Sequence, residues 1–113
     1  TQIQYKVIQE GVGQIPDFDD VVVVHYNGFL IDGTKFDSSY DRGEPATFAL
    51  NRVIQGWQQT LQEMPVGSKW KVYIPENLGY GITGVIKDAK NEEYVIPPSS
   101  TLIFDIELIN IVE

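Results

Sequence analysis

The chain has 113 residues, no cysteine and one histidine, and sixteen acidic residues against eight basic ones give a net charge of −8. A chain of this length forms one domain with its own hydrophobic core but not two. The composition excludes disulfides, thiolate metal sites and a thiol nucleophile, and the negative charge argues against nucleic acid as a partner. No run approaches the roughly 18 apolar residues of a membrane span.

The first half of the chain contains three segments with strand-like character. They are residues 3–8, residues 21–26, which begin with four valines, and the shorter segment 47–50. Branched and aromatic residues are enriched in strands. The turn residues Asp32 and Gly33 follow the valine run, so we expect a strand, a bend and a second strand there.

A short helix is expected next. Trp57, Leu61 and Met64 recur at helical spacing, and Pro65 and Gly67 then end the pattern. The large indole in the first turn has two interpretations. It either fills the core or forms the floor of an apolar pocket with a few polar groups, and spacing alone favours the core.

The second half of the chain contains two further strands. Residues 69–74 alternate between apolar and polar side chains, which predicts a half-buried antiparallel strand. Residues 102–108 alternate in the same way, but Ile109 and Ile111 shift the phase, so we expect either a β-bulge or a second buried face near the C-terminus. Residues 88–93 are the most polar stretch between these strands, and we expect a long surface loop there.

Together these elements predict an α+β domain over residues 1–113. Strands joined by hairpin-like connections favour antiparallel pairing, and the helix must cover one face of the sheet. No internal repeat or linker interrupts the pattern. We therefore expect an antiparallel, roughly five-stranded sheet that is wrapped around one short helix.

Three aromatic segments could contribute to a site. Asp37 follows Phe36 and could accept a hydrogen bond in an apolar pocket, but an ordinary Asx-type turn is the favoured interpretation. Tyr80 lies between two glycines and either donates to a ligand or covers a sheet edge. Phe104 lies on the last expected strand. The single histidine, His25, leaves no Ser-His-Asp set and no His-rich metal cluster, so we expect neither metal nor cofactor.

Several short motifs, taken in order, resemble the FKBP-type peptidyl-prolyl isomerases, and most of all the Mip-type bacterial subgroup. Each motif is weak alone, but together they follow the order and spacing of the family over nearly the whole chain. The Mip-type resemblance implies that the chain is a catalytic domain that follows a helical dimerisation region in a longer protein. The motifs are VHYNG at 24–28, DGTKFDSS at 32–39, VIQGW at 53–57, GYG at 79–81, IPP at 96–98 and LIFD at 102–105.

The resemblance implies one apolar pocket in which the proline ring of a substrate lies on Trp57. The Ile54 N–H and the Tyr80 hydroxyl would hold substrate carbonyl groups, and Asp37 would form a polar wall. The implied catalytic residues are Tyr26, Asp37, Ile54, Trp57, Tyr80 and Phe104, and the implied substrate-binding residues are Phe36, Arg42, Phe48, Val53, Val95 and Ile96.

The resemblance also suggests how parts of this pocket are arranged. Tyr26 and Arg42 would orient Asp37, and Gly56 would let the chain turn so that the preceding N–H groups face the pocket. Residues 85–94 are longer than the corresponding loop in compact members of the family. We expect this loop to influence which residue is preferred before proline.

The implied function is peptidyl-prolyl cis-trans isomerase (rotamase) activity that assists protein folding. Expected partners are proline-containing peptides, unfolded proteins and macrolides of the tacrolimus and rapamycin type, without membrane insertion. The domain itself is expected to be monomeric in a parent chain that forms a homodimer, and the periplasm or cell surface is favoured over the cytoplasm. The alternative is a non-catalytic chaperone or proline-peptide-binding module that uses the same pocket.

Overall fold

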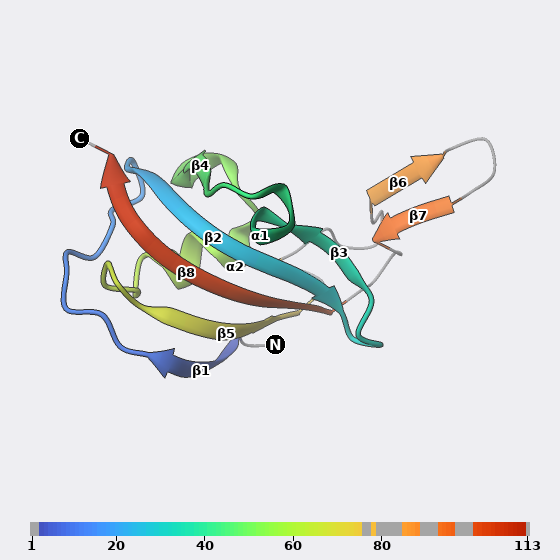
Figure 1. The fold of residues 1–113 in the computed structure, drawn as a ribbon, viewed down its shortest axis with the longest axis horizontal. Coiled ribbons are helices and arrows are strands. Elements are labelled where there is room, and N and C mark those ends of the chain that lie inside the picture. The colour runs from blue at the N-terminus through green and yellow to red at the C-terminus, as the bar shows by residue number, and fades with distance from the viewer. Residues whose placement is uncertain (1–2, 76–77, 79–84, 89–92, 97–100, 113) are drawn as a thin grey trace.

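Six strands form one antiparallel sheet in the computed structural model, which describes residues 3–75, 78, 85–88, 93–96 and 101–112 (Figure 1). The sheet order is β1-β5-β8-β2-β3, and β4 also pairs with β2. The predicted fold class is confirmed. The count exceeds the expected five because two four-residue strands share one edge of β2. The strands are β1 (Gln4–Gln9), β2 (Val21–Leu30), β3 (Lys35–Ser38), β4 (Ala46–Ala49), β5 (Lys69–Ile74) and β8 (Leu102–Val112).

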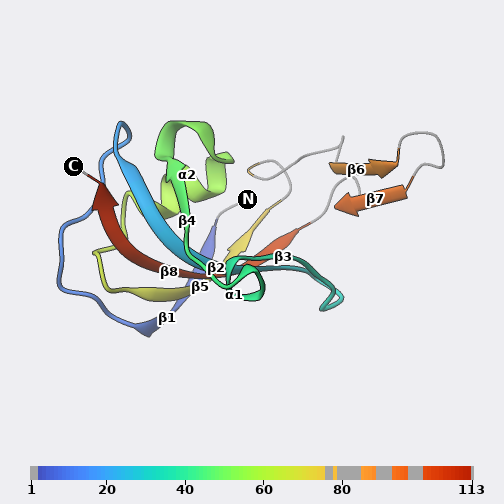
Figure 2. The same ribbon diagram turned by 45° about the horizontal axis from the view of Figure 1, so that its top comes forward.

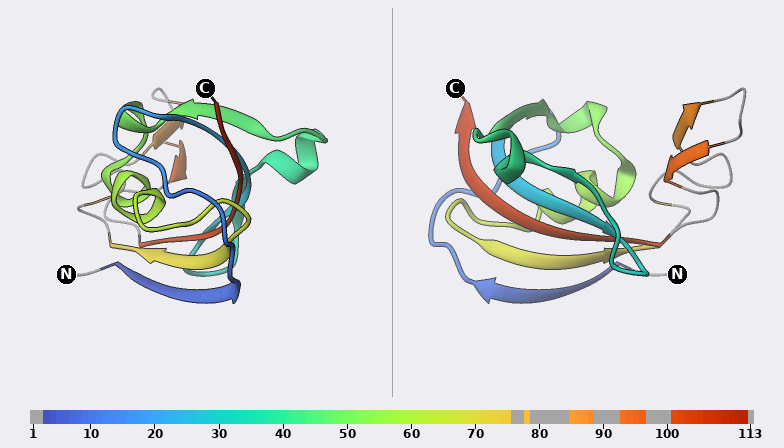
Figure 3. Two further views of the ribbon diagram at one scale, coloured as in Figure 1. Left: turned by 90° about the vertical axis from the view of Figure 1, so that its left-hand side faces the viewer. Right: turned by 45° about the vertical axis from the view of Figure 1, so that its right-hand side comes forward.

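The helix α2 (Gln55–Leu61) lies in the hollow of the curved sheet (Figures 2 and 3). Trp57, Leu61 and Met64 are all buried, as their helical spacing predicted. Two shorter helical segments are also present: α1 (Ser39–Arg42) and the 3-10 helix η1 (Leu50–Arg52). The fully buried core side chains between α2 and the sheet include Val22, Val24, Leu50, Leu61, Met64, Val72, Ile74, Leu102, Ile106 and Leu108. Within the described part of the chain, no helix is long and apolar enough to cross a membrane.

The strand β2 is the central element of the sheet. It pairs with β8 along its whole length, and its other edge pairs with β4 and then β3. The strand runs through Asn27 and Gly28 without a break. The predicted bend lies beyond it, where the Leu30 N–H donates to the Thr34 carbonyl at 2.8 Å and Gly33 takes a positive φ of 94°.

The β-bulge predicted in the last strand is confirmed. Val23 pairs with Asn110 and Val24 with Leu108, so Ile109 has no opposite residue on β2. The extra residue explains why the alternation of buried side chains changes phase there. The β5 strand has the bounds that its alternation predicted, whereas β1 and β4 are each displaced by one residue.

The surface loop expected at residues 88–93 is flanked by two strands that the sequence did not predict. β6 (Val85–Asp88) and β7 (Glu93–Ile96) pair as an antiparallel two-stranded sheet, separate from the main one (Figure 1). Both strands contain branched apolar residues, which favour extended pairing. The polar residues between the two strands favoured a loop, and for this reason the sequence did not predict the strands on either side.

Gly56 has a role that differs from the expected turn. It lies within α2, and a Cβ atom there would be only 2.5 Å from Cγ2 of Ile74 on β5. Contacts below about 3 Å between carbon atoms require one side to move. Gly56 is therefore the residue that allows α2 to approach the sheet closely.

We expect Gly56→Ala to lower the free energy of unfolding. Overpacking costs about 1–3 kcal/mol, and the higher helix propensity of alanine recovers at most about 1 kcal/mol, so the net change is destabilising. Urea denaturation measures it. Gln59→Ala, at an exposed position of the same helix, is the control and is expected to change stability little. Equal stability of the Gly56→Ala variant and the parent would contradict the close-packing role.

A candidate binding pocket at the start of helix α2

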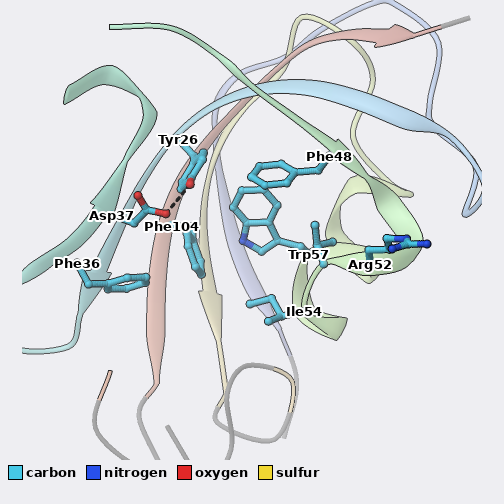
Figure 4. A pocket seen from close by; sticks show the side chains of 9 residues that line it. Tyr26, Phe36, Asp37, Phe48, Arg52, Ile54, Trp57 and Phe104 are labelled. Carbon is cyan, nitrogen blue, oxygen red and sulfur yellow. Dashed lines mark hydrogen bonds between the residues drawn. The ribbon is translucent and has the colours of Figure 1, made fainter. Parts of the chain in front are cut away.

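A pocket of about 280 Å³ lies between the start of α2 and one end of the sheet (Figure 4). Its wall is mainly aromatic and aliphatic, which suits an apolar ligand held by a few polar groups. The residues come from six different elements, β2, β3, β4, η1, α2 and β8, and from the turn before α2. The lining residues are Tyr26, Phe36, Asp37, Phe48, Arg52, Val53, Ile54, Trp57 and Phe104.

Trp57 forms the floor of this pocket. Three aromatic rings stand nearly perpendicular to the indole: Tyr26 at 86°, Phe48 at 90° and Phe104 at 83°. Their centroids lie 5.0 to 5.5 Å from that of the indole, the range of favourable edge-to-face contacts. The result is a flat base with upright walls (Figure 4).

Trp57 also belongs to the core, because only 4% of its surface is exposed. The two interpretations of this residue are therefore both correct. Its Nε1 is buried and has no acceptor among the described residues. In Figure 4 this nitrogen is on the side of the indole that faces Phe104, whose ring can weakly accept an N–H group.

The backbone before α2 places Ile54 at the pocket. Val53 and Ile54 are extended, and the Ile54 carbonyl accepts hydrogen bonds from the N–H groups of Trp57 at 3.0 Å and Gln58 at 3.1 Å. The Gln58 side chain also donates to the Val53 carbonyl at 2.9 Å. These bonds fix the entry into the helix. The Ile54 N–H itself has no acceptor in the described part of the chain, so it remains available to a ligand.

A hydrogen-bonded group of three side chains forms the polar wall of the pocket. The Tyr26 hydroxyl donates to Oδ2 of Asp37 at 2.5 Å, and Arg42 donates to Oδ1 of Asp37 and, at 3.1 Å, to the Tyr26 hydroxyl. Burial, followed by the hydrogen bond to Asp37, raises the pKa of Tyr26 above its ordinary value of 10. Hydrogen bonds to Tyr26 and Asp37 raise the pKa of Arg42. At neutral pH the phenol therefore stays protonated and the guanidinium charged.

The helix α1 brings Arg42 to this group. Ser38 caps the helix by accepting from the Asp41 N–H at 3.1 Å, and Ser39 accepts from the Tyr26 N–H at 2.6 Å. Asp37 also accepts from the Ser38 N–H at 2.9 Å. An Asx-type turn would use the N–H two residues on, and the bond here is to the next residue, so the favoured interpretation of Asp37 as an ordinary Asx-type turn is wrong. The carboxylate lines the pocket instead.

The structure brings most of the predicted site residues together. Arg42 lies behind Asp37 and not on the lining. Tyr80 falls outside the described residues, as do the side chains of Val95 and Ile96 on β7. The predicted residues that line the pocket are Tyr26, Phe36, Asp37, Phe48, Val53, Ile54, Trp57 and Phe104.

Arg52 is a lining residue that the sequence did not reveal. It is the last residue of η1 and immediately precedes Val53. The only signal was this adjacency to the motif at 53–57, because no periodic pattern marks a three-residue 3-10 helix. Among the described residues, no group of three or more acidic or histidine side chains gathers to hold a metal ion.

Comparison with protein families gives a match over residues 13–109 to the model described as FKBP-type peptidyl-prolyl cis-trans isomerase. The chain is 51% identical over 109 residues to the FKBP-type isomerase FkpA of Aeromonas hydrophila. It is 52% identical over 109 residues to the FKBP-type 22 kDa isomerase of Escherichia coli. Each alignment covers 96% of this chain, but only 38% and 50% of the two relatives. The chain thus spans half or less of the length of these curated relatives.

Solved structures show the same similarity in three dimensions. The crystal structure of FkpA from Escherichia coli matches with a TM-score of 0.85 and 44% identity, covering 96% of this chain and 47% of that one. A peptidyl-prolyl cis-trans isomerase from Pseudomonas syringae pv. tomato matches with a TM-score of 0.87 and 38% identity, covering 98% and 76%. The matched region includes the sheet, α2 and the pocket between them.

Proposed function

The chain belongs to the FKBP-type peptidyl-prolyl cis-trans isomerase family, and on this premise we propose that its pocket catalyses rotation about X–Pro peptide bonds. The observation that carries the proposal is the Trp57 floor with three upright aromatic walls. A flat apolar base of this size suits the five-membered ring of proline. The Ile54 N–H, which has no acceptor among the described residues, lies beside it and can hold a substrate carbonyl.

The chemistry requires no bond to a nucleophile. Rotation about a peptide bond faces a barrier of ~18–20 kcal/mol because amide resonance is lost when the bond twists. The carbonyl of a twisted amide is less polar than that of a planar one. A pocket that replaces water with aromatic rings therefore favours the twisted state over the planar one, and this difference lowers the barrier.

The stabilisation must act on the twisted state more than on the planar one. An acceleration of about 10⁴-fold corresponds to ~5.5 kcal/mol of such preferential stabilisation. Burial of the proline ring is the same in both states and only tightens binding, so the difference comes from the water-poor surroundings of the less polar twisted amide and from hydrogen bonds that strengthen in the twisted state, each contributing about 1 kcal/mol. We propose that Ile54 supplies one such bond and Tyr80 a second, and that Asp37, held by Tyr26 and Arg42, forms the polar wall.

Relaxation of a short X–Pro peptide from cis to trans tests this function. The uncatalysed process takes tens of seconds at 25 °C, and we expect a catalytic amount of the chain to shorten it at least tenfold. The alternative is a module that binds proline segments without catalysis. Peptide that shifts the tryptophan fluorescence while the relaxation rate stays unchanged would establish that alternative.

Gly28 provides a way to narrow the pocket without removing a lining residue. A Cβ atom there would lie 2.7 Å from Cζ of Phe36 and 2.9 Å from Cε1 of Phe104. The two rings would have to move, and both line the pocket. We expect Gly28→Ala to lower kcat/KM for an X–Pro peptide by about tenfold, within the usual cost of overpacking.

A glycine outside the pocket provides the control for this prediction. Gly33 lies in the turn after β2, with no atom within 4 Å of an added Cβ. Because Gly33 has a positive φ, Gly33→Ala strains the backbone of this turn. The pocket is nevertheless expected to keep its shape. If Gly28→Ala and Gly33→Ala had the same effect on kcat/KM, steric narrowing would be ruled out as the cause.

We also propose the partners and location that the family suggests. The partners are proline-containing peptides, unfolded proteins and macrolides of the tacrolimus and rapamycin type. One relative, from Legionella longbeachae, is named outer membrane protein MIP, which favours the periplasm or cell surface over the cytoplasm. A single catalytic domain over residues 1–113, monomeric by itself within a dimeric parent chain, remains a prediction.

A further inference from the structure

Two of the residues that line the pocket carry a charge: Asp37 and Arg52. The Asp37 carboxylate is neutralised by Arg42 and also accepts the Tyr26 hydroxyl. The Arg52 guanidinium, in contrast, has no carboxylate within salt-bridge distance among the described residues. Within the described part of the chain, the pocket lining therefore has one charge without an opposite partner, and that charge is positive although the chain as a whole carries −8.

Arg52 lies at the solvent-exposed rim of the pocket. It is exposed, ends η1 and directly precedes Val53 and Ile54, which line the pocket. In Figure 4 it lies on the opposite side of Trp57 from Asp37. Its side chain in Figure 4 is directed away from the indole, toward the outside of the pocket. A guanidinium in that position can meet the residues of a peptide that flank a proline on the indole, and not the proline ring itself.

We propose that Arg52 is a specificity-determining residue that favours an aspartate or glutamate over a lysine or arginine next to the proline. This inference rests on the proposed isomerase function and names the charge preference of that same site. A guanidinium pairs with a carboxylate through two parallel hydrogen bonds. The net negative charge of the chain repels acidic peptides. At the pocket, the positive charge of Arg52 attracts them instead.

The solvent exposure of Arg52 limits how strongly it can favour a glutamate peptide over a lysine peptide. An exposed ion pair contributes modestly and is screened by salt. Arg52 attracts the glutamate peptide and repels the lysine peptide, so the ratio of their kcat/KM values contains both effects. We therefore expect kcat/KM for the glutamate peptide to exceed that for the lysine peptide by about three- to tenfold at low ionic strength. In 1 M NaCl, where the Debye length is about 3 Å, the ratio should approach one.

The test uses matched peptides with glutamate, glutamine or lysine immediately before proline, and a second series with the same residues immediately after it. Isomerisation is followed by NMR for the parent chain and for Arg52→Glu. The readout is the glutamate-to-lysine ratio of kcat/KM, because a uniform loss of activity cancels in it. We expect the ratio to fall below one in Arg52→Glu in at least one series.

Lys6→Glu is the matched control. Lys6 is exposed on β1, outside the pocket lining, and forms no salt bridge among the described residues. The variant changes the net charge by the same amount as Arg52→Glu. We expect it to leave the ratio close to that of the parent. An equal shift in both variants would show that the preference arises from net charge and would overturn the role of Arg52.

Two other outcomes separate this inference from the proposed function. Equal kcat/KM for the glutamate and lysine peptides in both series, with isomerisation present, would reject the role of Arg52 and leave the function intact. If no peptide is isomerised, the dissociation constants of the same peptides are measured by tryptophan fluorescence. A glutamate preference that inverts in Arg52→Glu would then support charge selection while the isomerase function failed.

Discussion

Replacing Trp57 with alanine is expected to lower kcat/KM for an X–Pro peptide by about thirtyfold, the equivalent of the roughly 2 kcal/mol of apolar contact that a proline ring loses. The same change removes a side chain that is only 4% exposed and touches three aromatic rings. Truncation of a buried aromatic residue costs about 3–5 kcal/mol of stability. Isomerisation kinetics measure the first effect and urea denaturation the second.

A second substitution separates the two roles of this residue. Trp57→Phe retains an aromatic floor and loses less volume, so we expect it to recover much of the stability and part of the activity. Activity of each variant is compared only where denaturation curves show the chain folded. A folded Trp57→Ala variant that isomerises the peptide within threefold of the parent rate would contradict the assignment of the indole as floor.

The second large effect is expected at Asp37. Asp37→Ala removes the acceptor of both the Tyr26 hydroxyl and the Arg42 guanidinium. A half-buried donor without a partner costs about 1–3 kcal/mol, and the polar wall loses its fixed geometry. We expect kcat/KM to fall by about tenfold or more, measured with the same peptide as for Trp57.

Asp41 offers a matched control for this loss. Its carboxylate also forms an ion pair, at 2.7 Å with Lys35, but it is exposed and lies outside the pocket lining. Exposed pairs of this kind contribute little, so Asp41→Ala should change kcat/KM by less than twofold. Comparable losses in the two variants would mean that the position of α1, and not the Asp37 carboxylate, controls activity.

Much of the fold could be predicted because each element has a clear pattern. The alternation over residues 69–74 identified β5 with its bounds, and the phase shift at Ile109 identified the bulge. Helical spacing identified α2 from Trp57 and Leu61, but the helix ends at Leu61, earlier than expected, so Met64 is buried without belonging to it. These signals are local, since burial on one face of an element imposes a period on its own sequence.

The features that were missed depend on contacts between distant segments. The need for glycine at positions 28 and 56 arises from side chains on other strands. The β6 and β7 hairpin was obscured by the polar residues between its strands. Arg52 joins the lining because η1 directs it there. Spacing also could not distinguish a core tryptophan from a pocket floor, because Trp57 is both.

The central claim is that X–Pro rotation takes place on Trp57, and a single NMR titration tests it most directly. A proline peptide is added in steps to chain labelled with ¹⁵N. In the same samples we follow the indole N–H resonance of Trp57 and the cis-trans exchange cross-peaks of the peptide. The account predicts that exchange on the subsecond timescale appears and that both signals saturate at the same peptide concentration. Exchange that proceeds while the Trp57 resonance stays unmoved, or a saturated Trp57 resonance without exchange, would contradict it.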